Sequence, residues 1–75
     1  RFVRNVLIAI GNSGIPALAA RAETLLDDPS PLVRGMAVWA LARLLDADRF
    51  ATLKARFAAA ETDGDVRAEW DGRPA

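Results

Sequence analysis

The chain has 75 residues, of which 52% are hydrophobic, and its 10 basic and 10 acidic side chains cancel in net charge. This length suits one small domain, and the hydrophobic fraction is too high for a disordered chain. The sequence has no Cys and no His, which excludes disulfides, thiol or imidazole catalysis and almost every zinc or iron–sulfur site. We therefore expect no catalytic residue, no metal ligand and no cofactor within the chain, and no membrane contact, because no apolar run approaches ~20 residues.

The pattern is helical throughout, because alanine is abundant, β-branched residues are few and no segment alternates with period two. Turn sequences interrupt it at regular intervals, at residues 11–14, 27–31, 46–48 and 62–65. We predict an all-α fold of about five helices, over residues 2–10, 15–26, 31–45, 48–61 and 65–71.

The turns carry residues that start helices. Ser30 followed by Pro31 predicts an N-cap and the first helical position. Asp46 or Asp48 can cap the fourth helix, and Asp63 can cap the fifth.

The predicted helix 31–45 is apolar around nearly its whole circumference, and Arg34 and Arg43 are its only charged residues. A helix with this pattern must be covered on several sides. We therefore expect it to form the central layer of the domain.

The pair Val-Arg occurs three times, beginning at Val3, Val33 and Val66, at or near the start of a predicted helix. This spacing indicates a repeating unit of an outer helix, a short acidic turn and an inner helix that opens with Val-Arg. One complete unit spans residues 15–45, with parts of two others on either side, within a single domain over residues 1–75. We expect the chain to be an excerpt of a larger protein.

Two segments resemble a known family. Residues 26–41, Leu-Asp-Asp-Pro-Ser-Pro-Leu-Val-Arg-Gly-Met-Ala-Val-Trp-Ala-Leu, resemble a short HEAT-like repeat. With residues 4–14, Arg-Asn-Val-Leu-Ile-Ala-Ile-Gly-Asn-Ser-Gly, they resemble the C-terminal HEAT-like domain of bacterial tRNA epoxyqueuosine reductases. The resemblance covers roughly residues 1–45.

The resemblance implies a parent oxidoreductase of queuosine biosynthesis that is cytoplasmic and carries iron–sulfur clusters and cobalamin. The chain itself has none of the cysteines that those clusters need, so the cofactors would belong to a part of the parent upstream. The implied partners of this chain are the catalytic core of the parent and the tRNA anticodon stem-loop. Its implied role is a non-catalytic scaffold.

Arginines in the first turn of a helix oppose the helix dipole and need a compensating partner. We expect Arg34 to pair with Asp28 or with a carboxylate of the next turn, and Arg67 to pair with an aspartate at position 63 or 65. Alternatively, these guanidinium groups bind phosphates. For Arg4 both interpretations stay open, because no acidic residue precedes it.

Two asparagines are further candidates. Asn5 lies within a predicted helix, where asparagine is unfavourable, so we expect a specific hydrogen-bond partner for it. We expect Asn12 to be a left-handed C-cap, although the turn 11–14 can also offer polar groups to a phosphate or a neighbouring domain. The candidate contacts to tRNA or to an adjoining domain are therefore Arg4, Asn5, Asn12 and Arg34.

The apolar residues predict the packing. We expect Trp39 to lie in the core rather than to stack on a base, and Trp70 to pack on the open end of the stack or only within the parent. Because a stack without capping repeats exposes the sides of its end helices, we expect the edge with Val6, Leu7 and Ile10 to be covered by a crystal neighbour or a dimer mate.

The repeat pattern alone also supports a different function. The chain can be a protein–protein interaction module of an unrelated HEAT array. Cysteine clusters upstream of the chain would favour the reductase, and further Val-Arg repeats would favour the interaction module.

Overall fold

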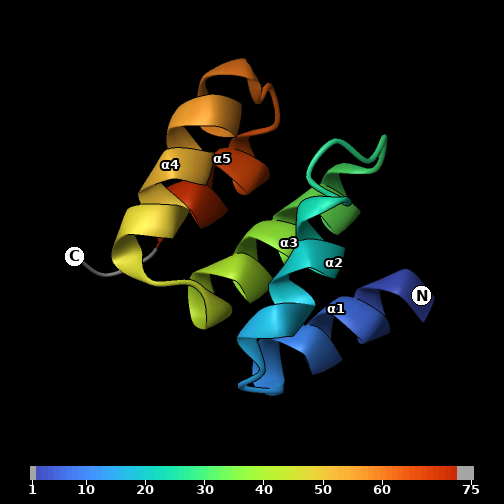
Figure 1. Ribbon diagram of the computed structural model, residues 1–75. Helices are drawn as coiled ribbons and strands as arrows, with labels where there is room; N and C mark the ends of the chain where they lie inside the picture. Colours follow the sequence, from blue (N-terminus) through green and yellow to red (C-terminus); the bar gives the residue numbers. More distant parts are fainter. Residues whose placement is uncertain (1, 73–75) are drawn as a thin grey trace.

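The computed structural model describes residues 2–72, and helices account for most of them (Figure 1). Five α-helices and two short 3₁₀ segments follow one another along this part of the chain. They are α1 (Phe2–Asn12), η1 (Pro16–Leu18), α2 (Ala19–Glu23), α3 (Pro31–Leu44), α4 (Ala47–Phe57), η2 (Ala58–Ala60) and α5 (Gly64–Asp71). The all-α fold and its five helices are therefore confirmed.

The helices form two layers (Figure 1). The inner layer consists of α1, α3 and α5, and α3 lies between the other two and contacts both. The outer layer consists of α2, which packs on α3, and α4, which packs on α5 through aromatic side chains. The predicted central position of the third helix is confirmed, and each inner helix is one that begins with the Val-Arg pair.

Side-chain caps begin the last three helices, as their sequences predict. The Ser30 hydroxyl accepts a hydrogen bond from the Val33 amide at 3.4 Å, and Pro31 follows as the first helical residue. The Asp46 carboxylate accepts from the Arg49 amide at 2.8 Å. In the last cap, Asp63 Oδ1 accepts from the amides of residues 65 and 66, at 2.9 and 3.1 Å.

The turn after α1 depends on Gly14, which has a φ of 68° in the left-handed region where glycine is favoured. Asn12 is the last residue of α1 and has a negative φ, so the prediction of a left-handed cap at Asn12 is wrong. Instead, the Ser13 hydroxyl donates to the Ile10 carbonyl at 2.7 Å and accepts from the Ile15 amide. A serine thus joins the helix end to the turn.

The second predicted helix, residues 15–26, is shorter than expected. Only Ala19–Glu23 is α-helical, and the 3₁₀ turn η1 precedes it. From residue 25 onward the backbone bonds tighten to three-residue spacing, as in the bond from the Leu25 amide to the Ala22 carbonyl. The Thr24 hydroxyl donates to the Arg21 carbonyl at 2.7 Å, which satisfies one of the last carbonyls of the helix.

The core surrounds α3. Ala37, Val38, Ala40 and Leu41 are fully buried, which explains why nearly its whole circumference is apolar. Burial of each of the larger side chains stabilises the fold by roughly 1.5–3 kcal/mol. The other buried apolar residues come from every neighbouring helix and from the turn after α2: Leu7, Ile10, Ala19, Ala22, Leu26, Phe50, Leu53, Val66 and Trp70.

An aromatic cluster joins α4 to α5. The Trp70 ring lies 5.3 Å from the Phe50 ring and 6.5 Å from the Phe57 ring, centroid to centroid, and Trp70 is only 2% exposed. Aromatic pairs at such distances stabilise a structure beyond the area they bury. Trp70 is therefore a core residue of this chain, and its burial does not require another domain.

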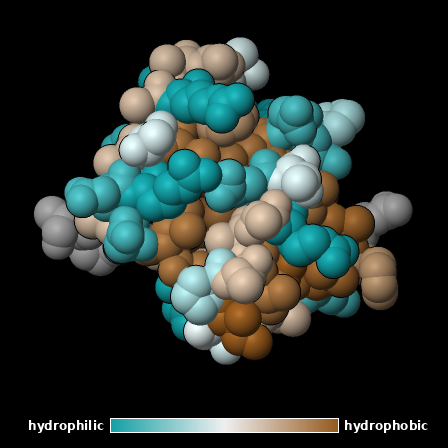
Figure 2. Space-filling model, viewed as in Figure 1, coloured by the Kyte–Doolittle hydropathy of each residue, from teal (hydrophilic) through white to brown (hydrophobic). Residues whose placement is uncertain are grey.

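The expectation of an uncovered apolar edge is wrong for two of its three residues. Leu7 is fully buried and Ile10 is 6% exposed, because both pack against α3 and its neighbours within the chain. The exposed large apolar residues near this end are instead Phe2, Val3 and Ile15, at 81%, 39% and 51%. Figure 2 shows hydrophobic surface gathered over the end of the molecule formed by α1 and α2.

Gly11 allows α1 and α3 to approach closely. The Trp39 ring lies directly over it, so that a Cβ added at Gly11 would meet three atoms of the ring. The Arg43 guanidinium lies 5.3 Å from the Trp39 ring centroid, and its Nε donates to the Gly11 carbonyl at 3.0 Å. Trp39 is therefore a packing residue, as predicted, and Arg43 holds its ring in place and satisfies a carbonyl at the end of α1.

The change Gly11→Ala should destabilise the fold, because the new methyl group overlaps the Trp39 ring. Overpacking of this kind costs about 1–3 kcal/mol, and the better helix propensity of alanine recovers up to about 1 kcal/mol. We expect a net loss of about 1–2 kcal/mol, a lower Tm in thermal unfolding and a changed near-ultraviolet spectrum of Trp39.

Gly64→Ala is the matched control, because no atom lies within 4 Å of a Cβ added there. Its Tm should stay unchanged or rise slightly. Equal effects of the two substitutions would show that the Gly11–Trp39 contact does not limit the approach of the helices.

Candidate functional site

A bidentate ion pair joins the turn before α5 to the start of α3. Arg34 Nε donates to Glu61 Oε1 and Arg34 Nη2 donates to Glu61 Oε2, both at 2.9 Å. The Arg34 side chain is 17% exposed and that of Glu61 is 7% exposed, so water screens the pair little. Parallel bonds of this kind fix the relative orientation of the two groups as well as their distance.

The ion pair changes the titration of both partners. The hydrogen bonds from Arg34 lower the pKa of Glu61 against the opposing effect of burial, and the Asp63 amide lowers it further. The same hydrogen bonds raise the pKa of Arg34. Glu61 therefore stays ionised at a lower pH than a free glutamate would, and the pair persists in the folded domain near neutral pH.

The third guanidinium nitrogen of Arg34, Nη1, bonds to the turn that precedes α3. Arg34 Nη1 donates to the main-chain carbonyls of Asp28 and Pro29, at 2.8 and 3.1 Å. All three guanidinium nitrogens therefore have partners within the chain. The structural interpretation of Arg34 is confirmed: it pairs with a carboxylate of the following turn, whereas Asp28 contributes its carbonyl instead of its carboxylate.

Arg67 repeats part of this arrangement. Its Nη1 donates to the Glu61 carbonyl, six residues earlier, just as Arg34 reaches the Asp28 carbonyl six residues before it. The prediction that Arg67 pairs with Asp63 or Asp65 is therefore wrong. The geometry explains why: Asp63 already caps α5, and the Val-Arg pair places the arginine over the carbonyl of its preceding turn.

The other three candidate residues lie together in α1. Arg4, Asn5 and Asn12 are exposed, and none of them makes a side-chain hydrogen bond or ion pair with residues 2–72. The expected partner of Asn5 is therefore not found in the described part of the chain. Asn5 and Asn12 are seven residues apart, which places them on one face of the helix. No acidic residue occurs in α1, so Arg4 has no carboxylate on its own helix.

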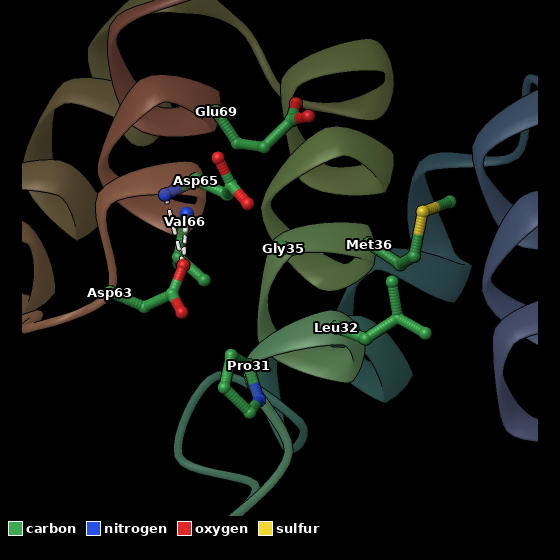
Figure 3. Close-up of a pocket in the computed structure, with 8 residues that line it drawn as sticks. All are labelled: Pro31, Leu32, Gly35, Met36, Asp63, Asp65, Val66 and Glu69. Atoms are coloured by element: carbon green, nitrogen blue, oxygen red, sulfur yellow. Dashed lines mark hydrogen bonds between the residues drawn. The ribbon is translucent and has the colours of Figure 1, made fainter.

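A groove lies between α3 and α5 on the inner layer (Figure 3). Its volume is about 200 Å³, and it is lined by Pro31, Leu32, Gly35, Met36, Asp63, Asp65, Val66 and Glu69. The α3 residues that line this inner groove are apolar and those contributed with α5 are largely acidic. In Figure 3 the side chains of Leu32 and Met36 extend from α3 on the side away from α5, and the carboxylates lie on the α5 side. Arg34 and Val38 line a different cavity with Glu61 and Trp70, so the inner groove uses another face of α3.

Apolar surface is left open in the inner groove. Leu32 is 56% exposed although leucine is usually buried, and a Cβ at Gly35 would meet Val66 and Glu69 only at ordinary contact distances of 3.8 Å. Gly35 therefore widens the groove without being required by the packing. Leu32 and Met36 are four residues apart, which places both side chains on one face of α3. This exposed face could not be recognised in the sequence, because the helix is apolar around nearly its whole circumference.

Chemistry within the described residues is limited. No group of three or more His, Cys, Asp or Glu side chains that could hold a metal ion is found among residues 2–72. No helix in this part of the chain is long and apolar enough to cross a membrane. The structure offers two candidate surfaces, the exposed polar residues of α1 and the inner groove.

The Arg34–Glu61 pair should make stability depend on pH. Because the pKa of Glu61 is lowered in the folded state, its contribution is fully present above the unfolded value of about 4.3 and is lost as pH falls through the folded pKa. Glu61→Gln should cost about 2 kcal/mol at pH 7. In chemical unfolding, the two proteins should converge as the pH is lowered below about 4.

Glu23→Gln is the matched control, since Glu23 also pairs with an arginine, Arg49, at 3.1 Å. Those side chains are 29% and 50% exposed, so this substitution should cost less than about 1 kcal/mol. If Glu61→Gln and Glu23→Gln have equal effects, the half-buried Arg34–Glu61 pair does not stabilise the stack as we describe.

The comparisons with known proteins agree with this architecture. The family model of HEAT repeats matches residues 3–70, which include all of α3, α4 and the turns that carry the Arg34–Glu61 pair. No curated protein and no solved structure gives a significant match. HEAT repeats form helical scaffolds that commonly mediate protein interactions. With alternating inner and outer helices and a model match over most of its length, this chain belongs to the HEAT-repeat family.

Proposed function

We propose that the chain is the non-catalytic HEAT-like domain of an epoxyqueuosine reductase and supports the catalytic part of that enzyme on tRNA. The observation that carries the proposal is the resemblance of residues 4–14 and 26–41 to that domain. Iron–sulfur clusters and cobalamin would be held by the rest of the parent, because this chain offers no cysteine. A cytoplasmic location goes with this proposal.

The scaffold role draws on the two contacts that join the inner helices. Gly11 and Trp39 come from the two segments that carry the resemblance, and their contact holds α1 on α3. Arg34 and Glu61 hold the turn before α5 on the start of α3. A stack joined in this way is rigid enough to present one surface in a fixed position relative to its parent.

The tRNA contact in this proposal is α1. Arg4, Asn5 and Asn12 are exposed there and have no partner within residues 2–72. The absence of acidic residues from α1 favours the approach of a phosphate backbone to this helix. Arg34 is already saturated with partners, so we assign it to the scaffold, and the candidate contacts narrow to the three residues of α1.

A protein-binding module of an unrelated HEAT array is the second candidate. The observation that favours it is the inner groove, which combines exposed apolar residues with three carboxylates. Ferredoxin-type cysteine clusters encoded upstream of Arg1 would favour the reductase, and further Val-Arg repeats would favour the array.

Arg4→Ala should weaken binding of the chain to a tRNA anticodon stem-loop. A lost phosphate contact flattens the dependence of log affinity on log salt concentration by about one unit. We expect weak binding by the 75-residue chain and a measurable change in fluorescence anisotropy titrations at two salt concentrations.

Arg56→Ala is the control, since Arg56 is an exposed arginine of the outer layer and its loss changes the net charge equally. If Arg4→Ala leaves affinity and salt slope at the values of Arg56→Ala, the proposed tRNA contact through Arg4 is wrong. The scaffold role would then rest on the resemblance alone.

A further inference from the structure

We propose that the inner groove binds a basic, amphipathic helical segment of a partner protein. The segment would place apolar side chains against α3 and Lys or Arg side chains against α5. This inference is independent of the proposed tRNA contact, because the residues of α1 line no part of the groove.

The apolar half of the site is the exposed stripe of α3. Leu32 is one of only four large apolar residues that are strongly exposed within residues 2–72, and Pro31, Gly35 and Met36 extend its surface along the groove. Exposed apolar surface rimmed by polar residues is typical of binding sites. A helix fits this shape, since helical partners fill apolar grooves with residues one turn apart.

The acidic half fixes the charge of the partner. Asp63, Asp65 and Glu69 line the groove, and no basic residue lines it with them. Asp65 and Glu69 are exposed and form no ion pair with residues 2–72, so their charges are available to a ligand. Asp65 and Glu69 lie four residues apart on one face of α5, which matches cations spaced by one turn on a facing helix.

The neighbouring arginines do not cancel this charge. Arg34 is neutralised by Glu61 in the cavity on the other face of α3. Arg67 keeps its charge, but it does not line the groove and its guanidinium donates to the Glu61 carbonyl. Nucleic acid is disfavoured at this position, because its phosphates would face three carboxylates. Charge and shape together therefore point to a basic protein segment rather than to RNA.

The test uses a fluorescent synthetic peptide that is helical, with leucines on one face and lysines spaced four residues apart beside them. A second peptide carries glutamate at each lysine position. We expect the lysine peptide to bind the 75-residue chain at least tenfold more tightly at low salt, with the preference reduced as salt is added. Amide shifts in NMR spectra should concentrate at Gly35, Met36, Val66 and Glu69.

Two variants of the chain separate charge from shape. Asp65→Lys combined with Glu69→Lys should lower the affinity for the lysine peptide about tenfold and favour the glutamate peptide. Asp27→Lys, which makes the same kind of charge change outside the groove, should have an effect of less than about twofold. Gly35→Leu should fill the groove and weaken both peptides, and its thermal unfolding verifies that the fold is retained.

Three outcomes would overturn the proposal. They are equal binding of the two peptides, no binding of either, and amide shifts that fall outside the groove. A stem-loop RNA that shifts the groove amides and competes with the lysine peptide would assign the groove to nucleic acid instead. Loss of RNA binding in Arg4→Ala has no bearing on these results, so the two proposals fail separately.

Discussion

The need to cover α3 on several sides determines how the rest of this chain is arranged. Its residues Ala37, Val38, Ala40 and Leu41 are fully buried, and α3 contacts α1, α2 and α5, so the cover of α3 comes from more than one helix. One inner helix therefore lies on each side of α3 and the outer layer covers its back. This arrangement draws buried apolar residues from every α-helix of the chain, and it leaves the inner face as the open side of α3.

In the Val-Arg pair of α3 and of α5, the valine and the arginine each stabilise this layered arrangement. Val33 packs against the core and Val66 is buried in it, while the arginine that follows reaches back six residues to a carbonyl of the preceding turn. A cation in the first turn of a helix is unfavourable by itself. Arg34 offsets this cost with two carbonyls and the Glu61 carboxylate, and so ties one repeat to the next.

Much of this architecture could be predicted from the sequence, because it follows from local chemistry and periodicity. Helix starts at Ser30, Asp46 and Asp63 follow from capping residues, and the central position of α3 follows from its apolar circumference. The partner of Arg34 could be predicted only as a kind of residue. Glu61 is 27 residues away and its place depends on how η2 ends, which no local pattern encodes.

The failed predictions have different causes: glycine adopts a positive φ more readily than asparagine, and the cover of an apolar edge depends on packing between helices. Gly14 and not Asn12 takes the left-handed position, and Leu7 is covered by its own chain. The inner groove was not predicted at all. Leu32 and Met36 look like core residues in a helix that is apolar all round, and only the positions of α1 and α5 determine which of its sides stays open.

The distribution of charge suits the two ends of the stack to ligands of opposite charge. Residues 1–22 contain no acidic residue, whereas residues 61–72 contain five carboxylates and one arginine. In a layered stack this sequence asymmetry becomes a spatial one, because α1 and α5 lie on opposite sides of α3 (Figure 1). Exposed charges more than about a Debye length apart are largely screened from one another. Each end can therefore bind its ligand independently of the charges at the other end. One rigid scaffold can therefore bind a phosphate backbone at α1 and a basic segment at the inner groove. The charges of the Arg34–Glu61 pair cancel, so this pair favours neither ligand.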